Sequence, residues 1–219
     1  MKILELSDGE ASAAFLGKLF LQAGAEVVKV SRPGRPAPEP ALDLYLNAGK
    51  QTVSSPWHER PGALDDLVAG CDALITDLPA ATVLEHGVLD AGGDAGPAVR
   101  TSITPFGLSG PRRDWEATPA TLLALGCHTW LMGDPGQTPL TLPGNYPAYH
   151  SANFAFVTTM AALLREQPAP VRVEVSELEV LSTVHQMTDA MWWGQGIIRS
   201  RQGNCWDGMD PDGLFPCAD

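Results

Sequence analysis

Basic residues are scarce in this sequence. Its 219 residues include 14 Lys and Arg against 26 Asp and Glu, which gives a formal net charge of −12. Proteins that bind nucleic acids or anionic membrane surfaces use basic side chains to neutralise phosphate groups. The charge balance therefore argues against nucleic acid and membranes as partners. Any polyanionic ligand would need a local basic patch that works against a repulsive overall field.

Long apolar runs and closely spaced cysteines are also lacking. No stretch of about 18 apolar residues occurs, which predicts no transmembrane helix. Acidic residues interrupt the first 18 residues, which argues against a secretory signal peptide. The four cysteines form no C-x-x-C pair (Cys71, Cys127, Cys205 and Cys217). Scattered thiols without a secretory signal are typical of reduced proteins, so we expect a cytoplasmic protein.

Three common catalytic or cofactor motifs are missing. The turn after the first expected strand reads SDGEAS, not the G-x-G-x-x-G of dinucleotide-binding proteins, which argues against NAD and FAD. Residues 107–110 (GLSG) fall short of the G-x-S-x-G of serine hydrolases, and a tight turn explains them better. The five histidines are isolated in the sequence, so we expect no metal site (His58, His86, His128, His150 and His185).

The order of apolar segments predicts an α/β fold. Residues 3–6 and 26–30 have the composition of strands, and a helix between them is expected to begin with Ser12 as its N-cap. A strand, a helix and a strand so close together form a βαβ unit, which requires parallel pairing. The alternation continues with two helices and two strands (61–70, 72–77, 81–87 and 98–104). We therefore expect residues 1–110 to form a Rossmann-like parallel sheet flanked by helices.

Residues 111–219 have a more helical pattern. We expect helices at 118–133 and 150–166 and one strand at 171–176. An S-x-x-E capping box then starts a long helix that ends at the Trp192–Trp193 pair. Packing or an interface explains this aromatic pair better than a ligand does.

The stretch 145–166 raises a question about chemistry. Its second half has apolar residues at helical spacing, with Phe154 and Val157 expected on one apolar side. Its first half carries a polar cluster typical of the rim of a site (Tyr146, Tyr149, His150, Ser151 and Asn153). The stretch contains no Asp, and its only Glu stands at the far end. It therefore has no obvious acid or nucleophile.

Several segments resemble one known family in the same order. They include GAEVVKVSRP, LNAGKQTV, SITPFGLSGP, VRVEVSELEVL and the closing FPCAD. Together they are similar to class III CoA-transferases of the formyl-CoA and carnitine CoA-transferase type, with alpha-methylacyl-CoA racemase as a relative. The resemblance covers nearly the whole chain. It implies a CoA-binding Rossmann-like domain, a smaller second domain, interlocked dimers and longer members. We therefore expect an N-terminal part, 1–219, whose helical extension leads towards an absent second domain.

The resemblance also implies a covalent mechanism for which this chain lacks residues. The transferases use one aspartate as a nucleophile that attacks the thioester carbonyl and carries the acyl group. The resemblance places this aspartate at Ala148, whose methyl group cannot be acylated. The related racemase adds a histidine, and the matching position falls near Ala117. Asp114, Asp134 and His150 are possible substitutes that the sequence leaves open.

The resemblance also supplies candidate CoA-binding positions, and several of them are altered. Arg32 and Lys50 match basic residues of the family. The family's Asn-Phe pair appears as Asp77 and Leu78, and a nearby family arginine appears as His86. An aspartate beside a diphosphate is unfavourable because like charges repel. Coenzyme A is nevertheless the expected ligand, with no metal.

Two functions follow from the sequence. The first is a CoA-transferase family III homologue that binds or processes acyl-CoA and moves CoA between carboxylic acids if it is catalytic. The second is a catalytically degenerate homologue that acts as a scaffold or a regulatory partner subunit. In both cases, acyl-CoA or CoA is the expected ligand, and a homodimer or a homologous partner subunit is the expected assembly.

Overall fold

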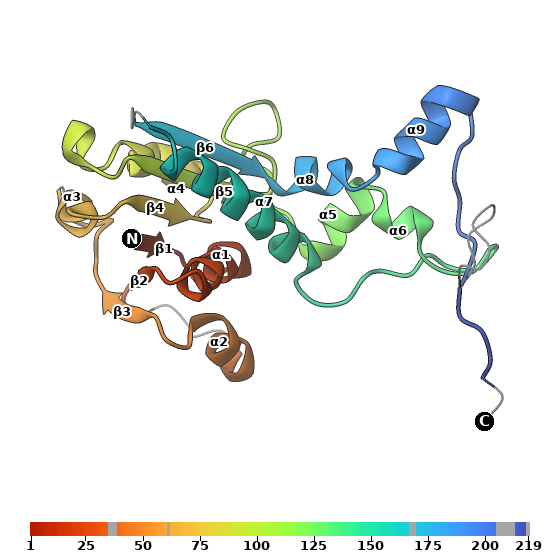
Figure 1. The fold of residues 1–219 in the computed structure, drawn as a ribbon, viewed down its shortest axis with the longest axis horizontal. Helices are drawn as coiled ribbons and strands as arrows, with labels where there is room; N and C mark the ends of the chain where they lie inside the picture. Colours follow the sequence, from red (N-terminus) through yellow and green to blue (C-terminus); the bar gives the residue numbers. More distant parts are fainter. Residues whose placement is uncertain (35–38, 61, 167–169, 205–212, 218–219) are drawn as a thin grey trace.

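One parallel sheet organises the molecule. The computed structural model describes residues 1–34, 39–60, 62–166, 170–204 and 213–217. In these residues, the strands form a six-stranded sheet in the order β3-β2-β1-β4-β5-β6 (Figure 1). The strands are β1 (Lys2–Leu6), β2 (Glu26–Ser31), β3 (Gln51–Ser54), β4 (Ala73–Thr76), β5 (Val99–Thr104) and β6 (Val171–Ser176). Every neighbouring pair is parallel, which confirms the expected Rossmann-like α/β fold.

Helices cover both faces of this sheet (Figure 1). On one face, α1 (Ala11–Gln22) and α7 (Tyr146–Leu163) pack against each other, and α2 (Pro40–Asn47) packs beside α1. On the other face lie α3 (Ala63–Val68) and α4 (Ala80–Glu85). Two short 3-10 helices precede β5 (Val88–Asp90 and Gly93–Ala95). Crossover helices on both faces bury the central strands of the sheet, which explains their nearly continuous apolar runs.

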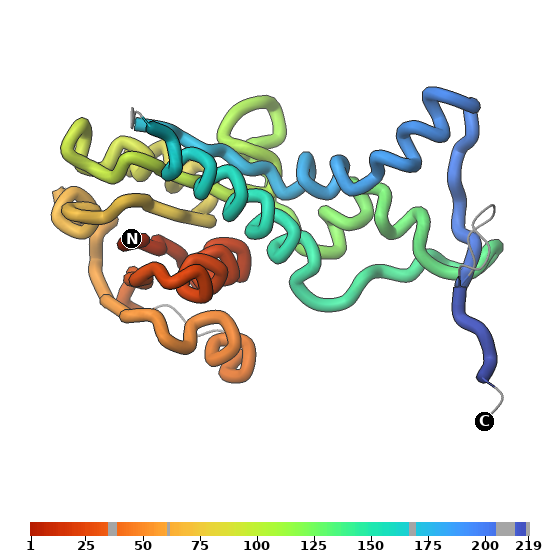
Figure 2. Tube along the Cα trace, viewed as in Figure 1, coloured from red at the N-terminus to blue at the C-terminus, as the bar shows by residue number. Residues whose placement is uncertain are grey.

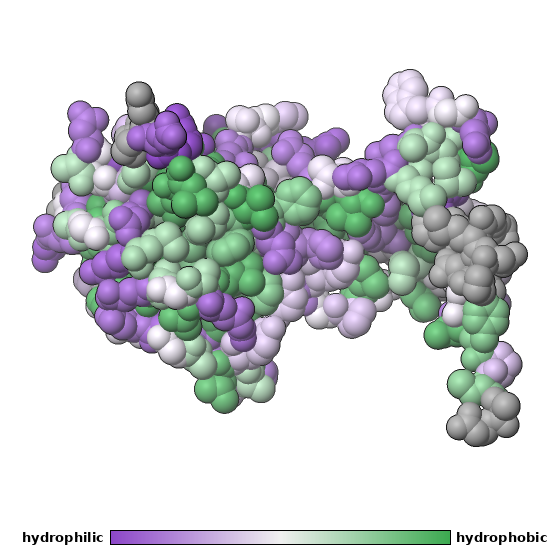
Figure 3. All heavy atoms as spheres, viewed as in Figure 1, coloured by the Kyte–Doolittle hydropathy of each residue, from purple (hydrophilic) through white to green (hydrophobic). Residues whose placement is uncertain are grey.

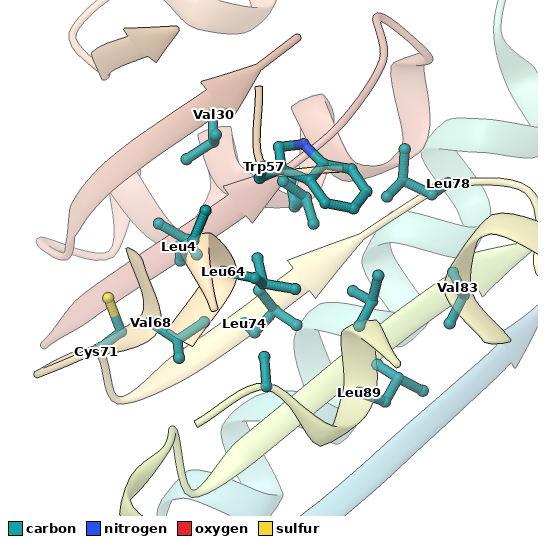
Figure 4. Close-up of a cluster of buried hydrophobic side chains, with 14 of the residues drawn as sticks. Leu4, Val30, Trp57, Leu64, Val68, Cys71, Leu74, Leu78, Val83 and Leu89 are labelled. Atoms are coloured by element: carbon teal, nitrogen blue, oxygen red, sulfur yellow. The ribbon is translucent and has the colours of Figure 1, made fainter. Parts of the chain in front are cut away.

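Alternation along the strands fills two separate cores. Ile3 packs with residues of α1 and α7, whereas the next residue, Leu4, packs with residues of α3 and α4. Successive side chains of a strand point to opposite faces, so one apolar run supplies both cores. Figure 4 shows the second core, where Leu74 of β4 lies among side chains that include Trp57 and Leu64.

A helical arm extends from the sheet (Figures 1 and 2). It is formed by α5 (Pro119–Leu125), α6 (His128–Leu131), α8 (Glu177–Thr183) and α9 (Gln186–Gln195). After α9 the chain runs back along α6. Two hydrogen bonds hold it there: the Trp130 indole N–H donates to the Arg199 carbonyl (2.9 Å), and Arg201 donates to the Trp130 carbonyl (3.1 Å). The sequence therefore predicts the helical extension correctly but not this return.

The sequence pattern predicts neither α2 nor β3. β3 is exposed along its whole length, and Leu46 is the buried residue of α2. Neither segment has the apolar periodicity on which sequence-based prediction depends. β3 forms because β2 offers an edge, where Val30 pairs with Val53, whereas α2 packs against α1.

The two long C-terminal helices expected from the sequence are each interrupted. The helix at 118–133 is divided by Gly126 and Cys127, and Cys127 has a φ of 63°. The helix that follows β6 begins as expected, since the Ser176 hydroxyl accepts the Glu179 N–H (3.3 Å). It ends at Thr183, and α9 begins at Gln186. At this break the His185 ring bonds to the Gly126 carbonyl (2.7 Å), so both interruptions meet at one point.

The expected apolar side of α7 is wrong in part: Met160 and Leu163 pack against the core, but Phe154 and Val157 do not. Phe154 and Val157 are 41% and 65% exposed, and apolar atoms lie on the outer surface along this helix (Figure 3). The buried side consists of small residues instead (Pro147, Ser151, Ala152, Ala155 and Thr159). Small side chains let α7 approach α1 and β5 closely, and the hydroxyls of Thr101 and Thr159 share a hydrogen bond of 2.7 Å.

Candidate functional site

A cavity of about 520 Å³ opens at the carboxyl ends of the strands. Its lining comes from the segments after β1, β4 and β5, from the start of α8 after β6, from residues 113–119 and from the first turn of α7. The strand order reverses between β1 and β4. In open parallel α/β sheets, ligands bind in the crevice at such a reversal. The position and size of the cavity are therefore those of a ligand site.

The two positions that the resemblance assigns to chemistry lie in this cavity. Ala148 belongs to the first turn of α7, and Ala117 belongs to the segment that leads into α5; both line the cavity. They are about 30 residues apart in the sequence and reach one site through the fold. Neither side chain can accept a proton or an acyl group.

Asp77 is the buried acid that ends β4. Its Oδ2 accepts the Ala13 N–H at the start of α1 (2.7 Å), and its Oδ1 has no hydrogen-bond partner of good geometry in the described part of the chain. Burial raises the pKa of Asp77 to about 7, although the bonds from the Ala13 N–H and the Ser7 hydroxyl oppose this shift. Near neutral pH this carboxyl group is therefore poised between its protonated and ionised forms.

Glu177 is a second buried acid in the cavity. It is the first residue of α8, and its Oε1 accepts the hydroxyl hydrogen of Ser12 (2.5 Å). Burial raises the pKa of Glu177, while the Ser12 hydrogen bond opposes the shift. The expected N-cap role of Ser12 is wrong, because α1 begins at Ala11 with Glu10 as its N-cap. Ser12 is used instead to hold this carboxyl group.

The rest of the cavity is also acidic. Four further carboxylate residues line it (Asp8, Glu10, Asp114 and Glu116). Arg113 lines it as well, but its Nε donates to Asp114 (3.1 Å). No Lys lines this cavity among the described residues. Its potential therefore favours neutral or cationic groups over anions.

Arg32 does not line the cavity itself, but it is paired with an acidic residue that does. Its Nε donates to Asp8 Oδ1 (2.7 Å), and its guanidinium also forms an ion pair with the same carboxylate. Asp8 lines the cavity, whereas Arg32 does not. A CoA phosphate that meets Arg32 would have to compete with this carboxylate.

Lys50 lies in the interior beneath α1. Its ammonium is 2.7 Å from Glu5 Oε2, and both side chains are 0% exposed. The same nitrogen donates to the Ala14 carbonyl (2.7 Å) and to Asn47 Oδ1 (2.9 Å). These three bonds use all the donors of an ammonium group. In this structure Lys50 therefore has no donor left for a ligand.

The two remaining candidate positions for CoA, Leu78 and His86, do not line this cavity. Leu78 is 1% exposed and belongs to the core drawn in Figure 4. His86 lines a different cavity of about 310 Å³, where its ring lies edge-on to Trp57 with centroids 5.5 Å apart. Of the five carried-over positions, Asp77 is the one that lines the main cavity.

The possible substitutes for the missing acid lie in different places. Asp114 lines the cavity, whereas Asp134 follows α6 on the arm. His150 stacks on Tyr146 with ring centroids 4.1 Å apart, and burial lowers the pKa of its imidazole. Sequence reasoning missed Glu177 because the capping box explains an acidic first turn without a site.

Three histidines that are far apart in the sequence share one row of rings. The ring of His128 lies 4.3 Å from that of His185 and 5.5 Å from that of Tyr146, which stacks on His150. The ring nitrogens of His128 and His185 bond to backbone carbonyls. Within the described residues, no group of three or more His, Cys, Asp or Glu side chains could hold a metal ion.

The fold and the cavity together define a ligand-binding domain of the open parallel α/β class. The family model described as CoA-transferase family III matches residues 1–219. The chain therefore belongs to the CoA-transferase family III. This membership agrees with the resemblance read from the sequence segments.

Two curated relatives have CoA-transferase names. Succinyl-CoA:(R)-benzylsuccinate CoA-transferase subunit BbsE of Thauera aromatica is 27% identical over 94% of this chain and 54% of its own length. Succinyl-CoA–D-citramalate CoA-transferase of Chloroflexus aurantiacus is 23% identical over 100% of this chain and 58% of its own length. The chain thus spans a little over half the length of these relatives.

A solved structure confirms the fold. The crystal structure of a CaiB/BaiF family protein from Brucella suis superposes with a TM-score of 0.87 at 20% identity, covering 96% of this chain and 61% of that protein. In the part of the chain that is described, we find no helix with the length and apolar character to span a bilayer.

Proposed function

We propose that this chain binds an acyl-CoA for a CoA-transfer reaction without itself forming a covalent acyl intermediate. The observation that supports this most is that Ala148 and Ala117 both line the cavity at the carboxyl edge of the sheet. Transfer through an acyl-enzyme needs a side chain that attacks the thioester carbonyl. An alanine at each of the two positions leaves the cavity able to hold a thioester but not to attack it there.

Complete transfer activity would then need residues from elsewhere. The chain covers 54% and 58% of the two curated relatives, and the relative from Thauera aromatica is named as a subunit. We infer that a further segment or a homologous partner subunit supplies the nucleophile. A homodimer and a cytoplasmic location stay predictions from the sequence.

A scaffold role is the second candidate, and the arm favours it. Trp193 of α9 is 86% exposed, and Ile198 on the return of the chain after α9 is 72% exposed. Large apolar side chains left in water are typical of surfaces that pack against a partner. In this alternative the chain contributes an assembly surface, and the cavity carries no substrate.

Mass spectrometry under two conditions tests the proposal. The purified chain is incubated with butyryl-CoA and measured in native buffer and after denaturation. We expect a non-covalent CoA-thioester complex in the native spectrum and no added butyryl mass after denaturation. A butyryl adduct that hydroxylamine removes would overturn the proposal, because hydroxylamine cleaves acyl anhydrides and thioesters and the adduct would therefore be a covalent acyl intermediate. An oligomer with no ligand at saturation would favour the scaffold role.

The variant Ala148→Asp sharpens this experiment. It restores a carboxylate at the expected position, but Ala117 and the acidic lining stay as they are. We expect no butyryl adduct on this variant either, since reactive geometry depends on the surrounding residues. A stable adduct would show that one substitution accounts for the missing activity.

A further inference from the structure

We propose that the cavity selects an acyl group that carries an ammonium group, held between the carboxyl groups of Asp77 and Glu177. This inference rests on the proposed acyl-CoA binding and adds the chemical class of the acyl group. It uses buried side chains of this chain that neither the resemblance nor the names of the relatives assign to substrate selection.

The first argument is the way in which the two acids are held. Asp77 follows β4 and Glu177 follows β6, yet they bond to consecutive residues of α1: Asp77 to the Ala13 N–H and Glu177 to the Ser12 hydroxyl. The first turn of α1 thus anchors two carboxyl groups from separate strand ends in one cavity. Groups fixed in this way are preorganised for a ligand.

The second argument is an unused acceptor. Asp77 is 8% exposed and lines the cavity. The Ser7 hydroxyl interacts with its carboxyl group, but Oδ1 has no hydrogen-bond partner of good geometry in the described residues. A buried acceptor without a partner costs about 1–3 kcal/mol. A ligand that brings an N–H donor to this atom removes the cost. An ammonium group has three donors, so one group can serve both acids.

The third argument is the sign of the field. Six carboxylate residues line the cavity, and the single arginine there is bonded to one of them, Asp114. A neutral amide would satisfy Oδ1 of Asp77 but would leave the negative potential uncompensated. A succinyl group, which the names of both curated relatives include, would add a further negative charge. A cationic acyl group satisfies the acceptor and the potential together.

Three thioesters of similar size test the selection by isothermal titration calorimetry at neutral pH. Butyryl-CoA and 3-aminopropionyl-CoA differ at one terminal group, a methyl or an ammonium, and succinyl-CoA ends in a carboxylate. We expect 3-aminopropionyl-CoA to bind about tenfold more tightly than butyryl-CoA, since charge-assisted hydrogen bonds are the stronger ones. Succinyl-CoA should bind most weakly of the three.

Two variants and one control locate the effect. Asp77→Asn and Glu177→Gln keep the size of each side chain and remove its charge, so each should reduce the preference for the amine. Glu85→Gln changes an exposed acid of α4 and should leave the preference intact. If both cavity variants keep the full preference, the subsite is wrong, whatever the affinity for CoA.

The same acyl groups on N-acetylcysteamine separate this inference from the proposed function, because these thioesters lack the nucleotide. If butyryl-CoA binds and the amine has no advantage, the subsite is overturned and acyl-CoA binding stands. If the CoA thioesters fail to bind, but the aminopropionyl N-acetylcysteamine thioester binds and its binding depends on Asp77, acyl-CoA binding is overturned and the subsite stands. If no thioester binds, both are overturned.

Discussion

Two buried acids of the same sheet, Glu5 and Asp77, differ in what compensates them. Glu5 on β1 is 2.7 Å from the Lys50 ammonium, and both side chains are 0% exposed. Asp77 at the end of β4 is also buried, but no ion-pair partner for it occurs among the described residues. Burial raises the pKa of both carboxyl groups, and the positive charge of Lys50 opposes the shift for Glu5.

The difference shows which of the two acids belongs to the interior of the fold and which one belongs to the candidate site. The Lys50 ammonium of the Glu5–Lys50 pair is completed by Ala14 and Asn47. Glu5 Oε1 has no hydrogen-bond partner among the described residues, but Glu5 lies in the interior and does not line the cavity. Asp77 has an oxygen in the same state within the described residues, but it lines the cavity at the open edge of the sheet. Buried acids with displaced pKa values that lie in a cavity without an ion-pair partner are candidates for functional sites.

Replacing Lys50, the ion-pair partner of Glu5, should have the largest effect on stability. Lys50→Met leaves the Glu5 carboxylate buried and unpaired, and we expect a loss of about 3–5 kcal/mol in the free energy of unfolding. Urea denaturation measures it. The double variant Glu5→Gln with Lys50→Met is the control and should recover much of the loss. A loss below about 1 kcal/mol in the single variant would mean that Glu5 is already neutral in the fold.

Replacing Asp77 by a neutral residue should change how the stability of the fold depends on pH. The folded pKa of Asp77 is raised to about 7 from 3.8. The folded chain therefore keeps a proton that the unfolded chain loses, and stability falls as pH rises from about 4 to 7. Asp77→Asn should remove this part of the slope and be more stable than wild type at pH 8, by up to about 4 kcal/mol.

Urea denaturation at pH 5 and pH 8 provides the comparison, with Glu85→Gln as an exposed control. A variant less stable than wild type at pH 8 would contradict the expectation. It would mean that the Ala13 N–H and the start of α1 stabilise the ionised Asp77 by more than burial costs.

Gly17 of α1 provides a smaller test of the enclosed pair. A Cβ at this position would lie 2.0 Å from Glu5 Oε2 and 3.1 Å from Lys50 Nζ. Glycine to alanine in a helix normally stabilises by about 0.5–1 kcal/mol. Here we expect Gly17→Ala to destabilise by about 1–3 kcal/mol, because the pair must shift. Gly194→Ala in α9, where a Cβ meets no atom within 4 Å, should stabilise instead. Thermal denaturation of both variants compares them, and equal shifts would refute the steric argument.

The smallest effect is expected at Ser12. Ser12→Ala removes the hydrogen bond to Glu177 and should cost about 1 kcal/mol, the usual net value of one such bond. It should also raise the pKa of Glu177 further, because the hydroxyl favours the ionised form. Ser182→Ala, which removes an exposed bond to the Leu178 carbonyl, is the matched control. If Ser12→Ala loses no more stability than Ser182→Ala, other contacts hold Glu177.

Sequence patterns predicted the central strands because burial on both faces demands continuous apolar residues. They did not predict β3, since an exposed edge strand needs no such run. They also placed Phe154 and Val157 on the buried side of α7, where the fully buried residues are small ones such as Ala152 and Ala155. Local composition does not reveal how near two helices will come.

For the candidate site, too, the sequence pointed to some of the residues that line the cavity and missed others. The resemblance pointed to Ala148, Ala117 and Asp77, and all three line one cavity. It also pointed to Lys50, which the fold encloses against Glu5. Glu177 carried no signal of its own in the sequence, because an acid in the first turn of a helix is common for reasons of capping and dipole.

The sequence by itself determined the class of fold, the family and the absence of an acid at Ala148 and Ala117, because these depend on residue type and order along the chain. Only the tertiary structure decided which acids are compensated and which are available. Asp77 and Glu177 are 100 positions apart, and the first turn of α1 joins them through two consecutive residues. Electrostatic environment depends on neighbours in space, which no local pattern records.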